Sequence, residues 1–128
     1  MAISSFEFNK ALSSLKDSMD LYYSEKNNQK SQKAYRDSCI QRFEYSIELS
    51  WKTAMKILGS DIRAAKPAVR EMARNNLISS PSKWFDFIDA RNSSSHSYDE
   101  DIATRVFKQI EAFYPEAMSL SKKLEDLM

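Results

Sequence analysis

The residues best suited to chemistry lie in one polar stretch, RNSSSHSY, at residues 91–98. It holds His96, the only histidine of the chain, five positions after Arg91. Near neutral pH an imidazole can take or give a proton, whereas a guanidinium stays cationic and offers a planar fork of donors to phosphate oxygens. Metal-free RNA cleavage, in which the ribose 2′-hydroxyl attacks the adjacent phosphorus, needs a base, an acid and a positive charge at the phosphorus. The two residue types therefore suit phosphodiester cleavage.

An arginine and a histidine near a helix boundary also commonly cap carbonyl groups or carry surface charge, and spacing alone does not separate these roles from catalysis. Two neighbouring features favour catalysis. The stretch follows a strongly apolar segment, KWFDFIDA, and precedes a run that can start a helix. In addition, Tyr98 places an aromatic hydroxyl beside His96.

Apolar residues at steps of three and four predict the helices that must position this stretch. The first two helices are expected at about residues 5–26 and 32–58, separated by the polar run NNQKSQ and closed by Gly59. Pro67 suits the first turn of a short third helix, and SSPS at 79–82 suits the cap of a fourth.

A final helix is expected after RNSSSHSY. Ser97 and Glu100 have the spacing of a capping box, and Pro115 predicts a kink or a broken backbone hydrogen bond within this helix. With one glycine and three prolines in 128 residues, hairpins and Gly-rich loops are nearly excluded. The predicted fold is an all-α, antiparallel up-and-down bundle of four to five helices, forming a single domain over residues 1–128.

Composition limits the environment and the ligands. The 29% of charged residues nearly cancel to a net charge of +1, so any site for a polyanion must be local. No apolar run approaches the roughly 20 residues of a membrane span, and MAISSFEFNKAL lacks the pattern of a secretion signal. The lone Cys39 is expected to be a buried thiol, and with one histidine and one cysteine we expect no metal site or cofactor. A cytoplasmic protein is the expectation.

Three segments, RDSCIQRFEYSIELSWK, REMARNNLI with Trp84, and RNSSSHSYDE, together resemble the HEPN-domain proteins. The resemblance is to the small bacterial class encoded beside a minimal nucleotidyltransferase and labelled nucleotidyltransferase substrate-binding, or HepT-like, proteins. Arg91, Asn92 and His96 match the HEPN signature of an arginine, a polar residue and a later histidine. Tyr98 completes the Arg-x4-His-x-Tyr form of the toxin members.

The resemblance implies a HEPN-like bundle and a metal-independent ribonuclease toxin that a nucleotidyltransferase antitoxin silences. Arg91 would hold or polarise the phosphate, His96 would transfer protons, and Asn92 would orient the site. Tyr98 matches the tyrosine that the partner modifies with AMP in related pairs. A bulky anionic adduct beside Arg91 would occupy the place of a substrate phosphate.

The histidine count adds a prediction of its own. The acid and base roles are usually divided between two groups, but each chain supplies one histidine. A two-fold homodimer that brings two RNSSSH turns together would supply both. The resemblance implies the same arrangement, with the site facing a cleft at the interface.

Secondary positions allow more than one interpretation. Glu44 and Glu48 lie four apart on a helix and repel each other unless a cation intervenes; Arg42 or Arg91 could be that cation, which would give the group a role in positioning Arg91. Otherwise the carboxylates form a solvated face. Tyr45 and Trp51 are expected in the core or at the dimer interface rather than stacked on bases.

Lys66, Arg70 and Arg74 form a short basic ridge that could follow an RNA backbone, although such ridges are usually only soluble surface.

Two other functions stay open. The chain could be a non-catalytic subunit that binds a nucleotide or presents a substrate to a nucleotidyltransferase, with Arg91 and His96 as phosphate ligands. It could also be a helical scaffold in which RNSSSHSY is only a turn. The paired aspartates and Gly-Ser loop of a nucleotidyltransferase are missing, so the chain is expected to be the partner of that enzyme.

Overall fold

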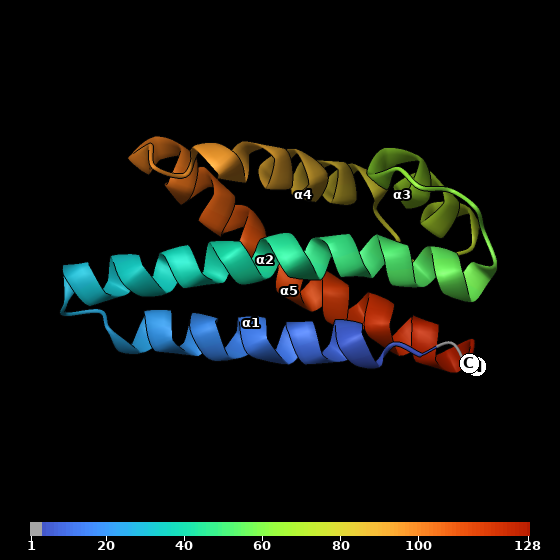
Figure 1. Ribbon diagram of the computed structural model, residues 1–128, viewed down its shortest axis with the longest axis horizontal. Coiled ribbons are helices and arrows are strands. Elements are labelled where there is room, and N and C mark those ends of the chain that lie inside the picture. Colours follow the sequence, from blue (N-terminus) through green and yellow to red (C-terminus); the bar gives the residue numbers. More distant parts are fainter. Residues whose placement is uncertain (1–3) are drawn as a thin grey trace.

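Residues 4–128 are described by the computed structural model, which contains five α-helices and, within that range, no strand (Figure 1). The helices are α1 (Phe6–Ser24), α2 (Gln29–Leu58), α3 (Ala65–Arg74), α4 (Pro81–Ser93) and α5 (Glu100–Asp126), and a short 3-10 helix, η1 (Ser94–His96), joins α4 to α5. The predicted all-α bundle is therefore confirmed.

Helix α2 lies at the centre of the bundle (Figure 1). Helix α1 packs antiparallel along one side of it, and α4 runs antiparallel to it on the other side. Helix α5 crosses α2 obliquely and also contacts α1 and α4, whereas the short α3 packs between α2 and α4. As a result η1 lies at one end of the bundle, and the start of α1 and the end of α5 lie at the other.

The two ends of α2 show how local side chains set its length. At its start the Asn28 side chain accepts a hydrogen bond from the Ser31 backbone N–H at 3.1 Å, so the helix begins at Gln29 inside the polar run expected to separate two helices. Glutamine and lysine are good helix formers, and polarity alone does not end a helix. At the other end Gly59 has a φ of 68°, and the Ser60 N–H donates to the Met55 carbonyl at 2.9 Å, as its predicted capping role requires.

Helix α5 differs from its predicted form at its N-terminal cap. The capping-box prediction is wrong: the cap is Asp99, whose carboxylate accepts from the backbone N–H groups of Asp101 (2.9 Å) and Ile102 (3.2 Å). Ser97 instead belongs to the preceding turn, where its N–H donates to the Ser94 carbonyl. The helix also continues through Pro115, which removes one backbone donor without ending it.

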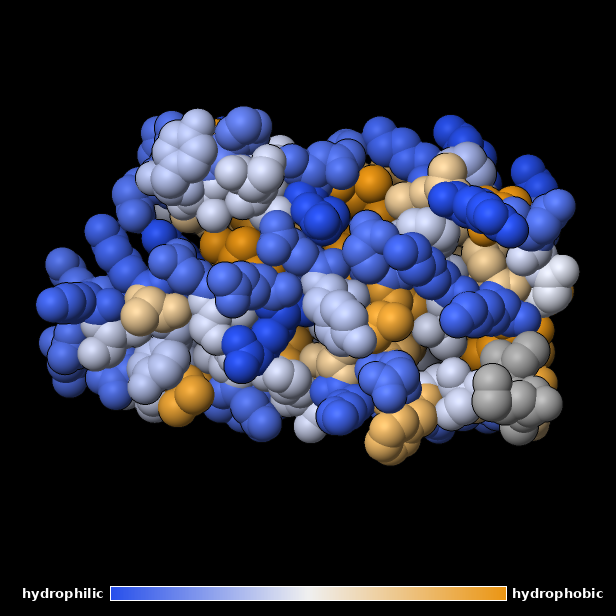
Figure 2. Space-filling model, in the orientation of Figure 1, coloured by the Kyte–Doolittle hydropathy of each residue, from blue (hydrophilic) through white to orange (hydrophobic). Residues whose placement is uncertain are grey.

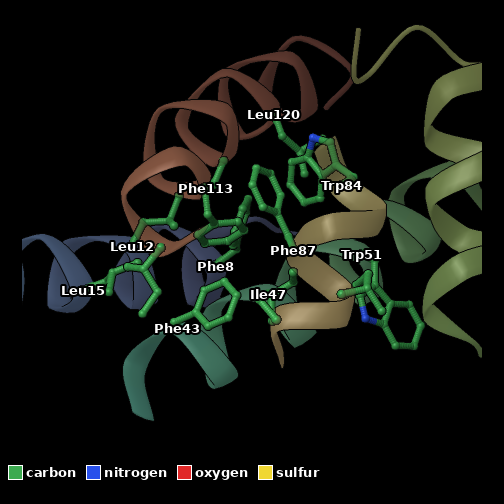
Figure 3. Packing of buried hydrophobic residues seen from close by; sticks show 14 of the residues in the cluster. Phe8, Leu12, Leu15, Phe43, Ile47, Trp51, Trp84, Phe87, Phe113 and Leu120 are labelled. Carbon is green, nitrogen blue, oxygen red and sulfur yellow. The ribbon is translucent and has the colours of Figure 1, made fainter. Parts of the chain in front are cut away.

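Aromatic residues from three helices form the centre of the core (Figure 3). The Phe113 ring of α5 lies edge-on to Phe43 of α2 at 5.2 Å, and to Phe87 and Trp84 of α4 at 5.5 and 5.7 Å between ring centroids. Such pairs add about 0.5–1.5 kcal/mol each beyond the burial of their area. Arg91 follows Phe87 by one helical turn and therefore lies on the same face of α4.

The outer surface is mainly polar. Figure 2 shows one face that is largely hydrophilic, with apolar residues visible in recesses between the helices. Among the helices of residues 4–128, none has both the length and the apolar character needed to cross a membrane.

Candidate functional site

Arg91 lies in the last turn of α4, and its side chain contacts α2. Its Nη1 atom is 3.4 Å from the Glu44 carboxylate, and about a third of its side chain is exposed. This contact is longer than the roughly 2.7–2.9 Å of a strong charge-assisted hydrogen bond. Within residues 4–128 it is the single side-chain hydrogen bond of Arg91, so donors of the guanidinium stay available for a phosphate. Of the two arginines expected as the counter-ion of Glu44, the structure places Arg91 there.

Ser94 begins η1 and connects the same carboxylate to the turn. Its side chain is buried, and its hydroxyl is 2.6 Å from the Arg91 carbonyl oxygen and hydrogen-bonded to the Glu44 carboxylate. Glu44 thus contacts both the arginine and the first residue of the turn that follows it. Ser94 was not among the predicted site residues, because three adjacent serines look alike in the sequence. Helical spacing from Arg91 does not distinguish it either, because Ser94 and Ser95 lie three and four positions after Arg91.

His96 and Tyr98 are both exposed. The Tyr98 hydroxyl lies 3.4 Å from His96 Nδ1, and the two rings are edge-on with centroids 6.0 Å apart. Tyr98 is 83% exposed, so its hydroxyl is open to a large partner. Asn92 is exposed near the end of α4, and its backbone carbonyl accepts from the Ser95 hydroxyl at 3.4 Å.

On the C-terminal side of the turn that carries His96 lies an ion pair that no sequence pattern predicted. The Arg36 guanidinium of α2 donates from Nη1 and Nη2 to the two oxygens of Glu100, at 2.9 and 3.1 Å. These hydrogen bonds lower the pKa of the Glu100 carboxyl to about 2 and raise the pKa of Arg36. The partners are 64 positions apart, so no local pattern could have paired them.

Other residues expected near Arg91 lie in different surroundings. Arg42 points toward α1, where it donates to the Ser14 hydroxyl at 2.8 Å, and it also donates to Ser38 of its own helix. Glu48 pairs with Lys52 at 3.5 Å. Both members of that pair line an open groove of about 410 Å³ beside Arg91.

Tyr45 and Trp51, two aromatic residues of α2, lie in different surroundings. Trp51 is buried in the core, as expected, whereas Tyr45 is 56% exposed and lines the groove beside Arg91. The core alternative is therefore wrong for Tyr45, and an interface position stays a prediction.

The basic ridge is largely neutralised by its own protein. Lys66 pairs with Asp89 at 3.1 Å, and Arg74 with Glu71 at 2.9 Å. Arg70 lies over the Phe85 ring at 5.5 Å. These contacts reduce the positive charge free to follow an RNA backbone, and RNA contact at the ridge stays a prediction. Within residues 4–128 no three His, Cys, Asp or Glu side chains gather as a metal site would require.

Comparison with known proteins gives relatives of two kinds. Residues 4–126 match the model of a family described as nucleotidyltransferase substrate binding protein like. A protein of Haemophilus influenzae named probable ribonuclease HepT is 37% identical over 93 residues, which are 66% of this chain and 64% of the relative's own length. The match thus leaves about a third of that relative uncovered.

Two solved structures share the fold. HI0074 of Haemophilus influenzae, reported as showing the fold of a substrate binding domain of a nucleotidyltransferase, matches with a TM-score of 0.82 and 29% identity, over 95% of this chain and 99% of its own. A protein of Thermus thermophilus matches with a TM-score of 0.78 and 25% identity, over 91% of this chain and 98% of its own. Since the family model spans nearly the whole chain, the protein belongs to the family of nucleotidyltransferase substrate binding-like proteins, as its motifs predicted.

Proposed function

We propose that this protein is a metal-independent endoribonuclease, the toxin of a pair whose antitoxin is a minimal nucleotidyltransferase. One observation carries the proposal: Glu44 holds Arg91 at the base of the turn that presents His96. A cation paired with Glu44 and an exposed imidazole five positions later are the two kinds of group that attack by a 2′-hydroxyl requires. The HepT homologue supports the same interpretation.

In the proposed reaction, His96 of one chain takes the proton of the 2′-hydroxyl as the oxygen attacks phosphorus. Arg91 stabilises the charge that develops on the phosphorane oxygens. The bond to the 5′-oxygen breaks, and His96 of a second copy gives that oxygen a proton. The products are a 2′,3′-cyclic phosphate and a free 5′-hydroxyl, and no metal takes part.

Silencing would use Tyr98. The partner would transfer AMP from ATP to the Tyr98 hydroxyl and release pyrophosphate. This leaves an anion next to the turn at residues 94–99, which we call the catalytic turn. The exposure of Tyr98 and its contact with His96 support this step.

The deciding experiment is RNA cleavage by the purified protein in excess chelator. We expect wild type to leave 2′,3′-cyclic phosphate ends, and Arg91→Ala and His96→Ala to lower the rate by about 100-fold or more each. The control is Arg63→Ala, because Arg63 is an exposed arginine outside the site and its variant should cleave as wild type does. Cleavage that survives both site substitutions would refute the assignment.

The family description and HI0074 favour one alternative, a subunit that binds a nucleotide or substrate for a nucleotidyltransferase. It predicts no cleavage by wild type, together with calorimetric binding of ATP or AMP that weakens in Arg91→Ala.

A further inference from the structure

We propose that Arg36 and Glu100 are positioning residues for the catalytic turn. Their ion pair joins the C-terminal side of this turn to α2, and the contact of Ser94 with Glu44 joins its N-terminal side to the same helix. His96 lies between these two contacts, which we call the two anchors. The catalytic consequence of this proposal rests on the proposed ribonuclease function, whereas its structural consequence does not.

The contact between Arg36 and Glu100 fixes an orientation as well as a distance. Two nitrogens of the planar guanidinium donate to the two oxygens of one carboxylate, at 2.9 and 3.1 Å. Such a paired arrangement restricts rotation of both groups. Lys33 approaches the same carboxylate at 3.5 Å, and Asp37 lies 3.8 Å from Arg36, so the pair sits in a small network.

The two partners differ in burial: the Arg36 side chain is largely buried, whereas 56% of the Glu100 side chain is exposed. Among the residues that the structure describes from 4 to 128, Arg36 is the single buried residue that carries a charge, with 9% of its surface exposed. A buried guanidinium needs a partner that compensates for its lost water. Glu100 is that partner, and because its pKa is about 2 it stays ionised over the whole physiological pH range. If Arg36 released Glu100, its remaining carboxylate neighbour would be Asp37, at the longer distance of 3.8 Å.

The two anchors define a short span that contains the histidine. Positions 36 and 44 are eight residues apart, about 12 Å along α2. The chain between Ser94 and Glu100 is itself hydrogen-bonded, from the Ser97 N–H to the Ser94 carbonyl at 3.1 Å and from the Asp99 N–H to the His96 carbonyl at 3.0 Å. Loss of either anchor would leave one end of this span free to move away from Arg91.

A purely structural pair would give different results. If the pair only joined α5 to α2, removing it would lower stability, but molecules that are still folded would cleave at the normal rate. If Glu100 only repelled RNA through its charge, its loss would change KM. A positioning role instead predicts a fall in kcat, because small displacements of a catalytic group slow the chemical step.

The experiment measures kcat and KM for Glu100→Gln, Arg36→Met and the double variant. We expect kcat to fall by about tenfold or more in each, with KM within about twofold of wild type, and the double variant to be no slower than the slower single variant. The matched control is Glu116→Gln, which breaks the ion pair with Lys83, a 3.2 Å contact of α5 with α4 outside the turn. This control should leave both constants unchanged.

Hydrogen–deuterium exchange supplies a readout that does not depend on activity. In Glu100→Gln we expect the amides of Ser97 and Asp99 to exchange faster, while amides in the middle of α5 keep their wild-type rates. An unchanged exchange rate at residues 94–99 would overturn the proposal whether or not the protein is a nuclease. If wild type cleaves RNA and the folded variants cleave equally well, the positioning role is wrong although the proposed function stands.

Discussion

At the scale of single residues, the carboxylate of Glu44 makes the connection between helix α2 and the proposed chemistry. It contacts Arg91 and Ser94 together, so one side chain sets both the direction of the guanidinium and the start of the turn. The helical spacing of Glu44 and Glu48 indicated that a cation should lie beside them, but could not decide between Arg42 and Arg91. That choice depends on which face of α2 packs against α4, which is a tertiary property.

A prediction at the same scale concerns the reactivity of the Cys39 thiol. Its side chain is fully buried, and this burial raises the pKa of the thiol to about 11. Since the thiolate is the reactive form, a shift from the usual value of 9.0 lowers the reactive fraction near pH 8 on the order of 100-fold. The native protein should therefore react with a disulfide reagent far more slowly than the protein in guanidinium chloride, as followed by absorbance.

Cys39→Ser supplies the blank for that measurement. Equal rates in native and denatured protein would show that the thiol is accessible and that α2 opens readily around it.

At the scale of elements, the start of α5 shows why a local pattern can indicate the right helix and the wrong cap. Ser97 and Asp99 are both good cap residues, and both precede acidic residues that favour the first turn of a helix. The backbone conformation of the turn before the helix determines which of the two residues caps α5. It uses the Ser97 N–H in a bond to the Ser94 carbonyl, and it leaves Asp99 in an extended conformation with its carboxylate facing the free amides.

The revised cap predicts a difference between two neighbouring substitutions. Asp99→Ala should lower the free energy of unfolding by about 1 kcal/mol, because two backbone N–H groups of α5 lose their acceptor. Ser97→Ala should change it by less than about 0.5 kcal/mol. Urea titration followed by circular dichroism measures both, and the reverse order would restore Ser97 as the cap.

At the scale of the whole molecule, the features repeated along the chain could be predicted and the pairings between distant segments could not. The five helices follow from apolar spacing, and Gly59 ends α2 because glycine readily adopts the positive φ that this cap requires. The pairing of Arg36 with Glu100 depends on α5 crossing α2, which no window of sequence contains. The motif residues were named from the sequence, with Arg91 as one of two possible partners of Glu44, but the contacts of Ser94 and the Arg36–Glu100 pair were not.

The proposed dimer gives a prediction that concerns the assembly. If cleavage needs one His96 from each of two chains, wild type mixed equally with His96→Ala, after subunit exchange, should retain about a quarter of the rate of the same total amount of wild type, because random pairing leaves that share of wild-type dimers. Chains that act independently would retain about half. Mixing wild type with Arg63→Ala controls for the exchange procedure and should leave the rate unchanged.

The course of α5 also bears on how the molecule can be handled. This helix begins directly after the turn that carries His96 and extends for 27 residues, so its far end lies about 40 Å from its start. A fluorophore or a glass-surface linker attached after Met128 would therefore leave the His96 end facing solution. Individual tethered molecules could then be watched as they meet labelled transcripts.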